Sequence, residues 1–332
     1  MKALVLAPFS PYALSQLRGM MEVSYESWTN TRTLHDPTEL GRRLNDESID
    51  ILLTEADFIF EELFENAPRL KFVGICRNEL GHVDISAASK NGVLVVNTPG
   101  RNANAVAEIT LGFMLALARR IPSLDAYVKF GKWEDPVAPY LSFRGIELRT
   151  NILGIVGLGR IGKSVAKIAR SLGMEVLAFD PYAGALGQRI DGALLTDLDS
   201  VVKQSTFLSL NAPRSEETTG LISDNHLASM PSGSFLINTS FYEIVDESSL
   251  VNRLNCGPLA GAAFDVHPAH PVPPSSPLLK LNNVILTPHI GGATNETIER
   301  HSNMIVTDLR RYLRGYKPNN LVNPDVWQMY DH

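Results

Sequence analysis

The chain has 332 residues, of which 44% are hydrophobic, and its formal net charge at neutral pH is −6. This hydrophobic content is enough for two domains with cores of their own. Acidic and basic residues are mixed along the chain, so there is no basic face for nucleic acid, and we expect no nucleic-acid partner. No segment approaches the roughly 18 apolar residues of a membrane span, so we expect no membrane partner either. The two cysteines, Cys76 and Cys256, are too few for a disulfide framework, which favours a cytoplasmic protein.

The first hundred residues alternate short apolar runs with amphipathic segments, which is the pattern of a small α/β domain. Asp36 is placed to cap one of the predicted helices, and Gly92 to end another. In chain order, we expect strands at 3–7, 23–28, 49–54, 72–76 and 93–96, and helices at 12–20, 37–47, 61–66 and 87–91.

A long helix is predicted over residues 104–120, with apolar residues at helical spacing. The proline-containing stretch 131–143 carries Trp133 and Tyr140, and we expect it to form an arm or loop. Helix and arm together carry more apolar surface than one domain of this type normally buries. They therefore predict a homodimer formed through this part of the chain.

The stretch 151–180 reads NILGIVGLGRIGKSVAKIARSLGMEVLAFD, which predicts a strand, a glycine turn, a helix, a second strand and an acid. In this pattern Gly157 allows the tight turn, Gly159 lets the backbone approach a pyrophosphate, and Gly162 lets the helix pack close to the strand. The N–H groups at the start of the helix would then hold the phosphates. Asp180 stands where a carboxylate accepts the ribose hydroxyls, which favours NAD over NADP.

Further buried strands are predicted at 207–210, 235–238, 259–264 and 284–287, an irregular segment at 267–276, and a final helix at 294–313. The nucleotide fingerprint thus begins in mid-chain, after a complete α/β series. We therefore expect two Rossmann-like α/β domains with parallel, doubly wound sheets. Residues 101–291 would form an NAD-binding domain, inserted into a discontinuous substrate domain of residues 1–100 and 292–332.

The chain resembles the D-isomer-specific 2-hydroxyacid dehydrogenases, in the branch of D-3-phosphoglycerate dehydrogenase. The resemblance covers nearly the whole chain, and its motifs come in family order. Besides residues 152–182, they are VVNTPGRNANAVAEITLGFMLALARR at 95–120, NAPRSEETTGLI at 211–222, LINTS at 236–240, VDESSLVNRL at 245–254, GAAFDV at 261–266 and LTPHIGGAT at 286–294. The resemblance implies an oxidoreductase that uses NAD on a small-molecule substrate, and it also points to a homodimer.

The resemblance also implies a set of cofactor contacts that extends beyond the glycine turn. Asp265 is expected on the nicotinamide side of the cofactor. The expected contacts are Val106, Gly157, Gly159, Arg160, Ile161, Gly162, Asp180, Pro181, Asn211, Ala212, Pro213, Thr218, Thr239, Ser240, Asp265, His289, Gly291 and Gly292.

The family's chemistry requires a histidine that exchanges a proton, a carboxylate that orients and charges it, and an arginine that binds the substrate's carboxylate. The histidine matches His289. The arginine position holds Phe241, and the glutamate position holds His270. Phenylalanine cannot bind a carboxylate, and His270 can hydrogen-bond His289 but supplies no negative charge. We therefore expect a lower proton affinity for His289 than in ordinary members, and reduction favoured at mildly acidic pH.

The expected substrate loop departs from the family pattern as well. Asn78 and Glu79 stand where the similar branch carries glycines, whose N–H groups hold the substrate carboxylate. Arg77 is either a replacement cation or a member of a structural ion pair. A metal held by His267, His270 and His289 is an alternative that the proline-rich context disfavours, and we expect no metal.

These departures leave three functions open. The first is an NAD-dependent oxidoreductase acting on CH–OH groups with an atypical active site, whose substrate is not a simple 2-oxo acid. The second is an NAD-binding protein without dehydrogenase turnover that acts as a sensor or interaction partner. The third is a lyase or isomerase with tightly bound NAD.

Overall fold

The computed structural model describes residues 1–329, and their contacts divide the chain into two compact units. Unit 1 comprises Met1–Arg101 and the C-terminal segment that starts at Ala293, whereas unit 2 comprises Asn102–Gly292. The chain therefore leaves the first unit after Arg101, builds the whole of the second, and returns to the first. Among the described residues, no helix is both long enough and apolar enough to cross a membrane.

Unit 1 contains a five-stranded parallel sheet with the order β2-β1-β3-β4-β5. Because the three strands β3, β4 and β5 are buried along their whole length, they are apolar in sequence except for Thr54 at the end of β3. The strands are β1 (Lys2–Val5), β2 (Glu22–Tyr25), β3 (Ile51–Thr54), β4 (Phe72–Ile75) and β5 (Leu94–Val96).

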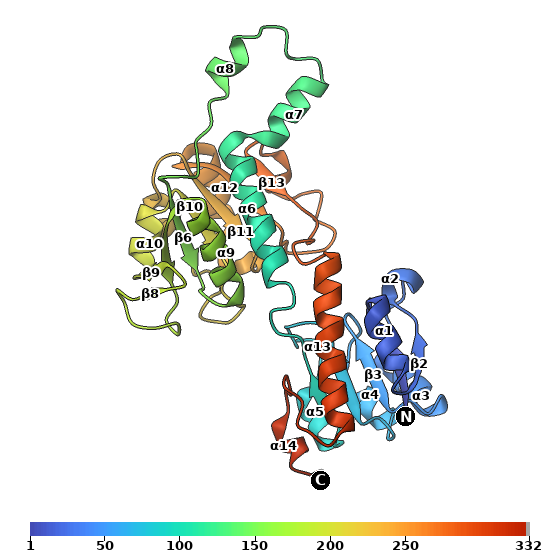
Figure 1. Cartoon of the computed structure of the whole chain (residues 1–332). Helices are drawn as coiled ribbons and strands as arrows, with labels where there is room; N and C mark the ends of the chain where they lie inside the picture. Colours follow the sequence, from blue (N-terminus) through green and yellow to red (C-terminus); the bar gives the residue numbers. More distant parts are fainter. Residues whose placement is uncertain (330–332) are drawn as a thin grey trace. The chain divides into compact units, whose positions relative to one another are not determined.

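Helices cover both faces of this sheet (Figure 1). Helices α1 (Pro11–Arg18) and α13 (Asn295–Leu313) pack on one face, and α3 (Pro37–Asp46), α4 (Glu61–Asn66) and α5 (Ile85–Lys90) on the other. The Asp36 carboxylate caps α3, accepting the N–H groups of Thr38 and Glu39 at 2.9 and 3.1 Å. The unit also contains the short helices α2 (Trp28–Thr31) and α14 (Pro324–Trp327).

Unit 2 contains an eight-stranded sheet with the order β13-β12-β11-β10-β6-β7-β9-β8. Strands β7 and β9 follow β6 on one side of the sheet, and β10 then pairs with β6 on its other side. The strands are β6 (Ile152–Val156), β7 (Glu175–Phe179), β8 (Arg189–Ile190), β9 (Ala193–Leu195), β10 (Phe207–Leu210), β11 (Ser234–Asn238), β12 (Leu259–Phe264) and β13 (Val284–Leu286). This order places a topological switch point between β6 and β10, where such folds bind dinucleotides.

Two apolar clusters fill the two faces of the unit 2 sheet. Helices α6 (Ala103–Arg119) and α9 (Arg160–Ser171) pack on one face. On the other face pack α10 (Leu198–Gln204), α11 (Asp224–Ser229) and α12 (Glu247–Cys256), together with the 3₁₀ turns η1 (Tyr242–Ile244) and η2 (Pro277–Lys280). The fold class predicted from the sequence, two Rossmann-like α/β domains, is confirmed.

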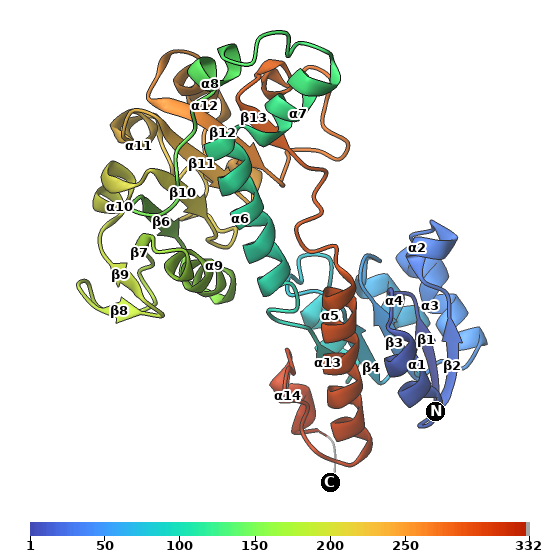
Figure 2. The ribbon, with the colours of Figure 1, turned by 45° about the horizontal axis from the view of Figure 1, so that its top comes forward.

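Three local expectations were wrong. Trp28 begins helix α2 instead of ending a strand, because the Ser27 hydroxyl accepts the Thr29 N–H at 3.3 Å and caps a helical turn. The predicted arm contains helix α8 (Ala138–Ser142), and an unpredicted helix, α7 (Ile121–Lys129), precedes it. Figure 1 shows both helices standing away from the rest of unit 2, and Figure 2 shows them in a view turned by 45°. The sheet is not wholly parallel, since β8 pairs with β9 in the antiparallel sense at its edge.

Candidate active site and cofactor site

The predicted site residues of unit 2, apart from Val106, follow the carboxyl ends of strands in its single sheet. Because these ends share one edge, residues far apart in sequence are gathered there. The glycine turn follows β6, Asp180 and Pro181 follow β7, the Asn211–Thr218 loop follows β10, Thr239–Phe241 follow β11, Asp265 and His270 follow β12, and His289–Gly292 follow β13. Val106 instead lies buried on α6.

Close packing excludes a side chain at two glycines of the turn, whereas the third glycine has free space around it. Gly157 has a φ of +93°, and a Cβ there would lie 2.5 Å from the backbone nitrogen of Ala212. A Cβ on Gly162 would collide with the Gly157 carbonyl oxygen, so the helix can approach the strand only without a side chain. At Gly159 a Cβ would meet nothing within 4 Å. The protein therefore leaves room beside Gly159, where a phosphate would approach the backbone.

Helix α9 presents its N-terminus at this turn. Gly159 is its N-cap, no side chain caps the helix, and its first turn contains no acidic residue. The backbone N–H groups and the positive end of the helix dipole are therefore available for an anion. The turn fits the pyrophosphate of a dinucleotide.

Asp180 has a structural role that the sequence did not reveal. One carboxylate oxygen accepts the Leu158 N–H at 2.7 Å, and the other accepts the Tyr182 N–H at 2.9 Å. The carboxylate therefore ties the glycine turn to the loop after β7. Further lone pairs remain on both oxygens, so a ribose hydroxyl can still donate to the same group.

Asn211, on the opposite side of the switch point, has a buried acceptor. Its amide nitrogen donates to the Ser209 carbonyl and hydroxyl oxygens, at 3.2 and 3.0 Å. Its amide oxygen is buried and accepts no hydrogen bond within the described part of the chain. Because buried polar atoms normally have partners, this oxygen is suited to accept a hydrogen bond from a ligand.

The turn that carries His289 is organised by Asp265, which is only 3% exposed. The Asp265 carboxylate accepts the Thr287 hydroxyl at 2.6 Å and the N–H groups of Ile290 and Gly291 at 2.9 and 2.6 Å. These three bonds hold the loop on both sides of His289, whose own φ is +56°. The structure thus gives Asp265 a role in positioning His289.

His270 contacts His289 directly. The Nε2 atom of His270 and the Nδ1 atom of His289 lie 3.0 Å apart, a hydrogen bond in which one ring donates and the other accepts. A glutamate at position 270 would instead bring a negative charge to the same ring nitrogen. With two imidazoles, protonating both would place two positive charges next to each other.

Phe241 points into apolar surroundings and is 7% exposed. Its carbonyl oxygen accepts the Asn238 amide N–H at 2.9 Å, and the adjacent Ser240 hydroxyl donates to the Ala212 carbonyl. The guanidinium carbon of Arg214 lies 5.4 Å from the centre of the Phe241 ring, a cation–π arrangement. An arginine from the neighbouring loop therefore covers the Phe241 ring, which stands at the position where the resemblance leads us to expect an arginine.

Arg214 was not predicted as a site residue. It follows Pro213, which was predicted, so its place after β10 was readable from the sequence. Its contact with Phe241 was not, because residues 27 positions apart are brought together only by the pairing of β10 with β11.

The predicted substrate loop of unit 1 follows β4. Arg77, Asn78 and Glu79 are all exposed there. Burial raises the pKa of the adjacent Cys76 thiol, with a smaller contribution from Glu55. Burial also lowers the pKa of His82, and the positive charge of Arg77 lowers it further. This thiol and this imidazole are thus neutral at neutral pH, and the loop's charge comes from Arg77 and Glu79.

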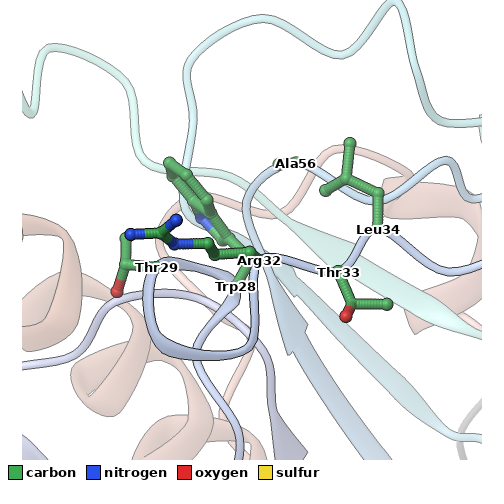
Figure 3. A pocket seen from close by; sticks show the side chains of 6 residues that line it. All are labelled: Trp28, Thr29, Arg32, Thr33, Leu34 and Ala56. Atoms are coloured by element: carbon green, nitrogen blue, oxygen red, sulfur yellow. The ribbon is translucent and has the colours of Figure 1, made fainter.

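A separate hollow of about 490 Å³ lies in unit 1. Figure 3 shows Trp28 and Arg32 on one side of it, and Thr33 and Leu34 on the other. Thr29 and Ala56 complete its lining. It contains none of the residues predicted for the site. Within residues 1–329, no group of three or more His, Cys, Asp or Glu side chains is arranged to hold a metal ion.

Comparisons with known proteins agree with this geometry. The family model for the NAD binding domain of D-isomer specific 2-hydroxyacid dehydrogenases matches residues 111–291, which is most of unit 2. A glyoxylate reductase from Thermofilum pendens is 38% identical over 289 residues, covering 87% of this chain and 85% of that protein.

Two further proteins match nearly the whole chain. A D-3-phosphoglycerate dehydrogenase from Archaeoglobus fulgidus is 35% identical over 324 residues, 97% of this chain, although the chain spans only 59% of that relative's length. The crystal structure of TT0316 protein from Thermus thermophilus superimposes with a TM-score of 0.83 at 34% identity, covering 97% of this chain and 100% of that one. The chain therefore belongs to the D-isomer-specific 2-hydroxyacid dehydrogenase family, and its cofactor is NAD.

Proposed function

We propose that the protein is an NAD-dependent oxidoreductase whose active site is atypical for its family, and whose substrate is a hydroxy or carbonyl compound other than a simple 2-oxo acid. The observation that carries this proposal is the buried, apolar Phe241 at the position of the substrate-binding arginine. A bidentate guanidinium–carboxylate pair cannot form there. A substrate whose carboxylate adjoins its carbonyl would lose its main anchor.

In this proposal the residues at the sheet edge bind the cofactor and place one proton-exchanging group. The glycine turn and the α9 N-terminus hold the pyrophosphate, Asp180 the ribose, and Asn211 a donor on the cofactor. A bound NAD would supply or accept the hydride at the reacting carbon of the substrate. His289 exchanges the proton with the substrate oxygen through Nε2, because His270 engages Nδ1.

The substrate loop of unit 1 contributes weaker anchors than the family's glycines would. Asn78 and Glu79 place side chains where backbone N–H groups would otherwise be exposed, and the Glu79 carboxylate repels an anion. Arg77 is the cation of this loop. The assignment of unit 1 to substrate binding and of unit 2 to NAD binding is part of the proposal.

Steady-state assays of NADH oxidation test the function. A panel of aldehydes, ketones and oxo acids should contain a compound that is reduced at least a hundredfold more efficiently than glyoxylate, hydroxypyruvate or D-3-phosphoglycerate. The variant His289→Asn should lose that activity. If it keeps full activity, the proton comes from another group, and Tyr242 is the next residue to replace. Binding of NADH with no turnover across the panel would instead favour a sensor without dehydrogenase activity.

We also propose a homodimer formed through unit 2. The predicted arm and helix α7, which precedes it, expose large apolar side chains, among them Tyr140 of the arm at 71% and Phe130 at 77%. An exposed apolar surface of this kind is typical of an interface. Light scattering at micromolar concentration should give twice the monomer mass of 36.5 kDa, and a mass near 36.5 kDa would rule out the dimer.

The proposed setting is cytoplasmic. Cys76 is buried and Cys256 is exposed, and both are free thiols. A reducing compartment suits two unpaired cysteines. The number of thiols titrated in protein purified without reductant checks this point, with two expected.

A further inference from the structure

The hollow of unit 1 has the size and the lining of a small-molecule site, although it contains none of the residues predicted for the active site. Its volume is about 490 Å³, whereas ligand pockets typically have roughly 300–1,000 Å³. Trp28, Leu34 and Ala56 give it a mainly apolar lining. Among the described residues that line it, Arg32 is the only charged one. The hollow therefore combines an apolar wall with a single positive charge.

The two acidic residues next to Ala56 in the chain hold the walls of this hollow together. Ala56 lies between β3 and α4, whereas the other lining residues lie between β2 and α3. Glu55 accepts the indole N–H of Trp28 at 3.2 Å. Asp57 accepts the backbone N–H of His35 at 3.0 Å, and its carboxylate lies 2.9 Å from the Nδ1 atom of the same residue. The two connections are thus tied together at two points, so the walls are formed before a ligand arrives.

Both acidic side chains are themselves fixed inside unit 1. Glu55 forms an ion pair with Arg101 at 2.5 Å, and each of these two side chains is 13% exposed. The Asp57 side chain is fully buried and accepts the Thr54 hydroxyl at 2.6 Å. Burial raises the pKa of Asp57, but the hydrogen bonds from His35 and Thr54 outweigh it and hold the pKa below its ordinary value. Each carboxylate is therefore engaged by partners inside the unit and does not neutralise a cation of the hollow.

The backbone of Arg32 is held in place, whereas its side chain is unpaired. Its φ is +55°, and its N–H donates to the Trp28 carbonyl at 2.8 Å. The residue is exposed, and within residues 1–329 its guanidinium has neither an ion-pair partner nor a hydrogen-bond partner. Figure 3 shows its side chain on the same side of the hollow as the Trp28 indole. An unpaired guanidinium and an aromatic ring that line one hollow are suited to a ligand that has both an acid group and an aromatic ring.

We propose that this hollow binds a small aromatic carboxylic acid, whose ring packs against Trp28 and whose carboxylate pairs with Arg32. The apolar wall removes the ring from water, and the guanidinium binds the carboxylate, so both parts of the ligand contribute to its affinity. The site shares no residue with the cofactor site of unit 2 or with the predicted substrate loop. The inference therefore goes beyond the proposed oxidoreductase function and does not depend on it.

Calorimetry on the full chain without cofactor tests the site. The probes are phenylacetate, which has both the ring and the acid, acetate, which has only the acid, and 2-phenylethanol, which has only the ring. We expect phenylacetate to bind with a dissociation constant of about 1 mM or below, and at least about tenfold more tightly than either of the other two.

Substitutions in the hollow separate the two contacts. Arg32→Gln should remove the preference for phenylacetate over 2-phenylethanol, and Arg32→Lys should retain part of it, because an ammonium keeps the charge but not the planar fork. Ala56→Leu adds a larger side chain to the lining and should weaken phenylacetate binding at least about tenfold by filling the hollow. Arg32 is exposed, so its variants should fold normally even if Ala56→Leu does not.

Two controls place the ligand in the hollow. Arg42→Gln removes the same charge from an exposed position on α3 of the same unit, outside the lining, and should leave all three affinities unchanged. His289→Asn changes the proposed active site and should leave phenylacetate binding unchanged as well. The inference is overturned if phenylacetate does not bind, if 2-phenylethanol or acetate binds as tightly, or if Arg32→Gln has no effect. Loss of binding in His289→Asn would also overturn it, because the acid would then occupy the active site.

Discussion

The turn after β6 and the turn after β11 lie at the same edge of one sheet, yet they follow the family pattern to very different extents. The first keeps all three glycines, and the backbone around Gly157 and Gly162 admits no side chain at either position. The second keeps its length but carries Phe241, packed into an apolar cluster, where the family resemblance leads us to expect an arginine.

The difference shows which parts of a site are tied to the fold. Backbone N–H groups bind the cofactor's phosphates, so their positions are set by close packing between helix and strand. A substrate anchor is the charged end of a side chain, and a neighbouring loop can supply it. We therefore expect cofactor binding and substrate choice to be separable in this chain, so that a substitution can impair one without the other.

Restoring the family residues should have the largest effect. In Phe241→Arg/His270→Glu, a carboxylate would again have a guanidinium partner, and His289 would again have a negative neighbour. A lost charged hydrogen bond costs several kcal/mol, so the efficiency with glyoxylate should rise by about two to three decades. Steady-state NADH oxidation measures this. Absence of any gain would mean that Asn78 and Glu79 also prevent glyoxylate binding.

Adding a side chain at Gly162, where the glycine turn is tightly packed, should destabilise the folded protein. Gly162→Ala forces a Cβ against the Gly157 carbonyl, and we expect a loss of about 3 kcal/mol in the free energy of unfolding. The control is Gly112→Ala on α6, where a Cβ meets nothing within 4 Å and a small gain is expected. Chemical denaturation measures both. Equal stabilities for the two variants would show that the turn is less tightly packed than described.

Adding a side chain at Gly159, where the same turn leaves free space, should weaken only cofactor binding. Gly159 has a φ of −72°, and no protein atom lies near its Cβ position, so Gly159→Ala should fold with wild-type stability. The added methyl group takes space that we assign to the pyrophosphate, and NADH affinity should fall about tenfold or more. Titration of NADH fluorescence provides the measurement. An unchanged NADH affinity would mean that the pyrophosphate does not bind next to Gly159.

Asp180→Ala should have the smallest effect. We expect the preference for NAD over NADP to narrow several-fold, because the repulsion of a 2′-phosphate disappears. Overall affinity should fall too, since the carboxylate also accepts the Leu158 N–H of the glycine turn. Calorimetry with both cofactors tests this, and if the unmodified protein bound NADP as tightly as NAD, or more tightly, the role of Asp180 would be contradicted.

The sequence predicted the parts of this site that depend on local pattern. Strand–glycine–helix periodicity identified β6, α9 and the turn between them, and buried apolar runs identified the other central strands. It did not predict the two-residue strand β8, which is too short to show a period, nor the break after Arg119, where Arg120 adopts a φ of +54° and α7 begins.

The sequence pattern could not predict contacts between residues that lie far apart in the chain. The sequence suggested that His270 can contact His289, and the structure shows the contact, but nothing local indicated that Arg214 would lie on Phe241 or that Asp265 would hold the His289 turn. These contacts depend on strand order. Strand order follows from packing across the whole sheet rather than from any one segment.

The most direct test of the central claim measures both NADH binding and glyoxylate turnover in the unmodified protein. We predict that NADH binds with a dissociation constant in the micromolar range or below, while kcat/KM for glyoxylate stays under roughly 10² M⁻¹s⁻¹, at least two decades below ordinary enzyme efficiency. Glyoxylate reduction at about 10⁴ M⁻¹s⁻¹ or more would contradict the account, because it would show that the loss of the family arginine has not altered substrate choice.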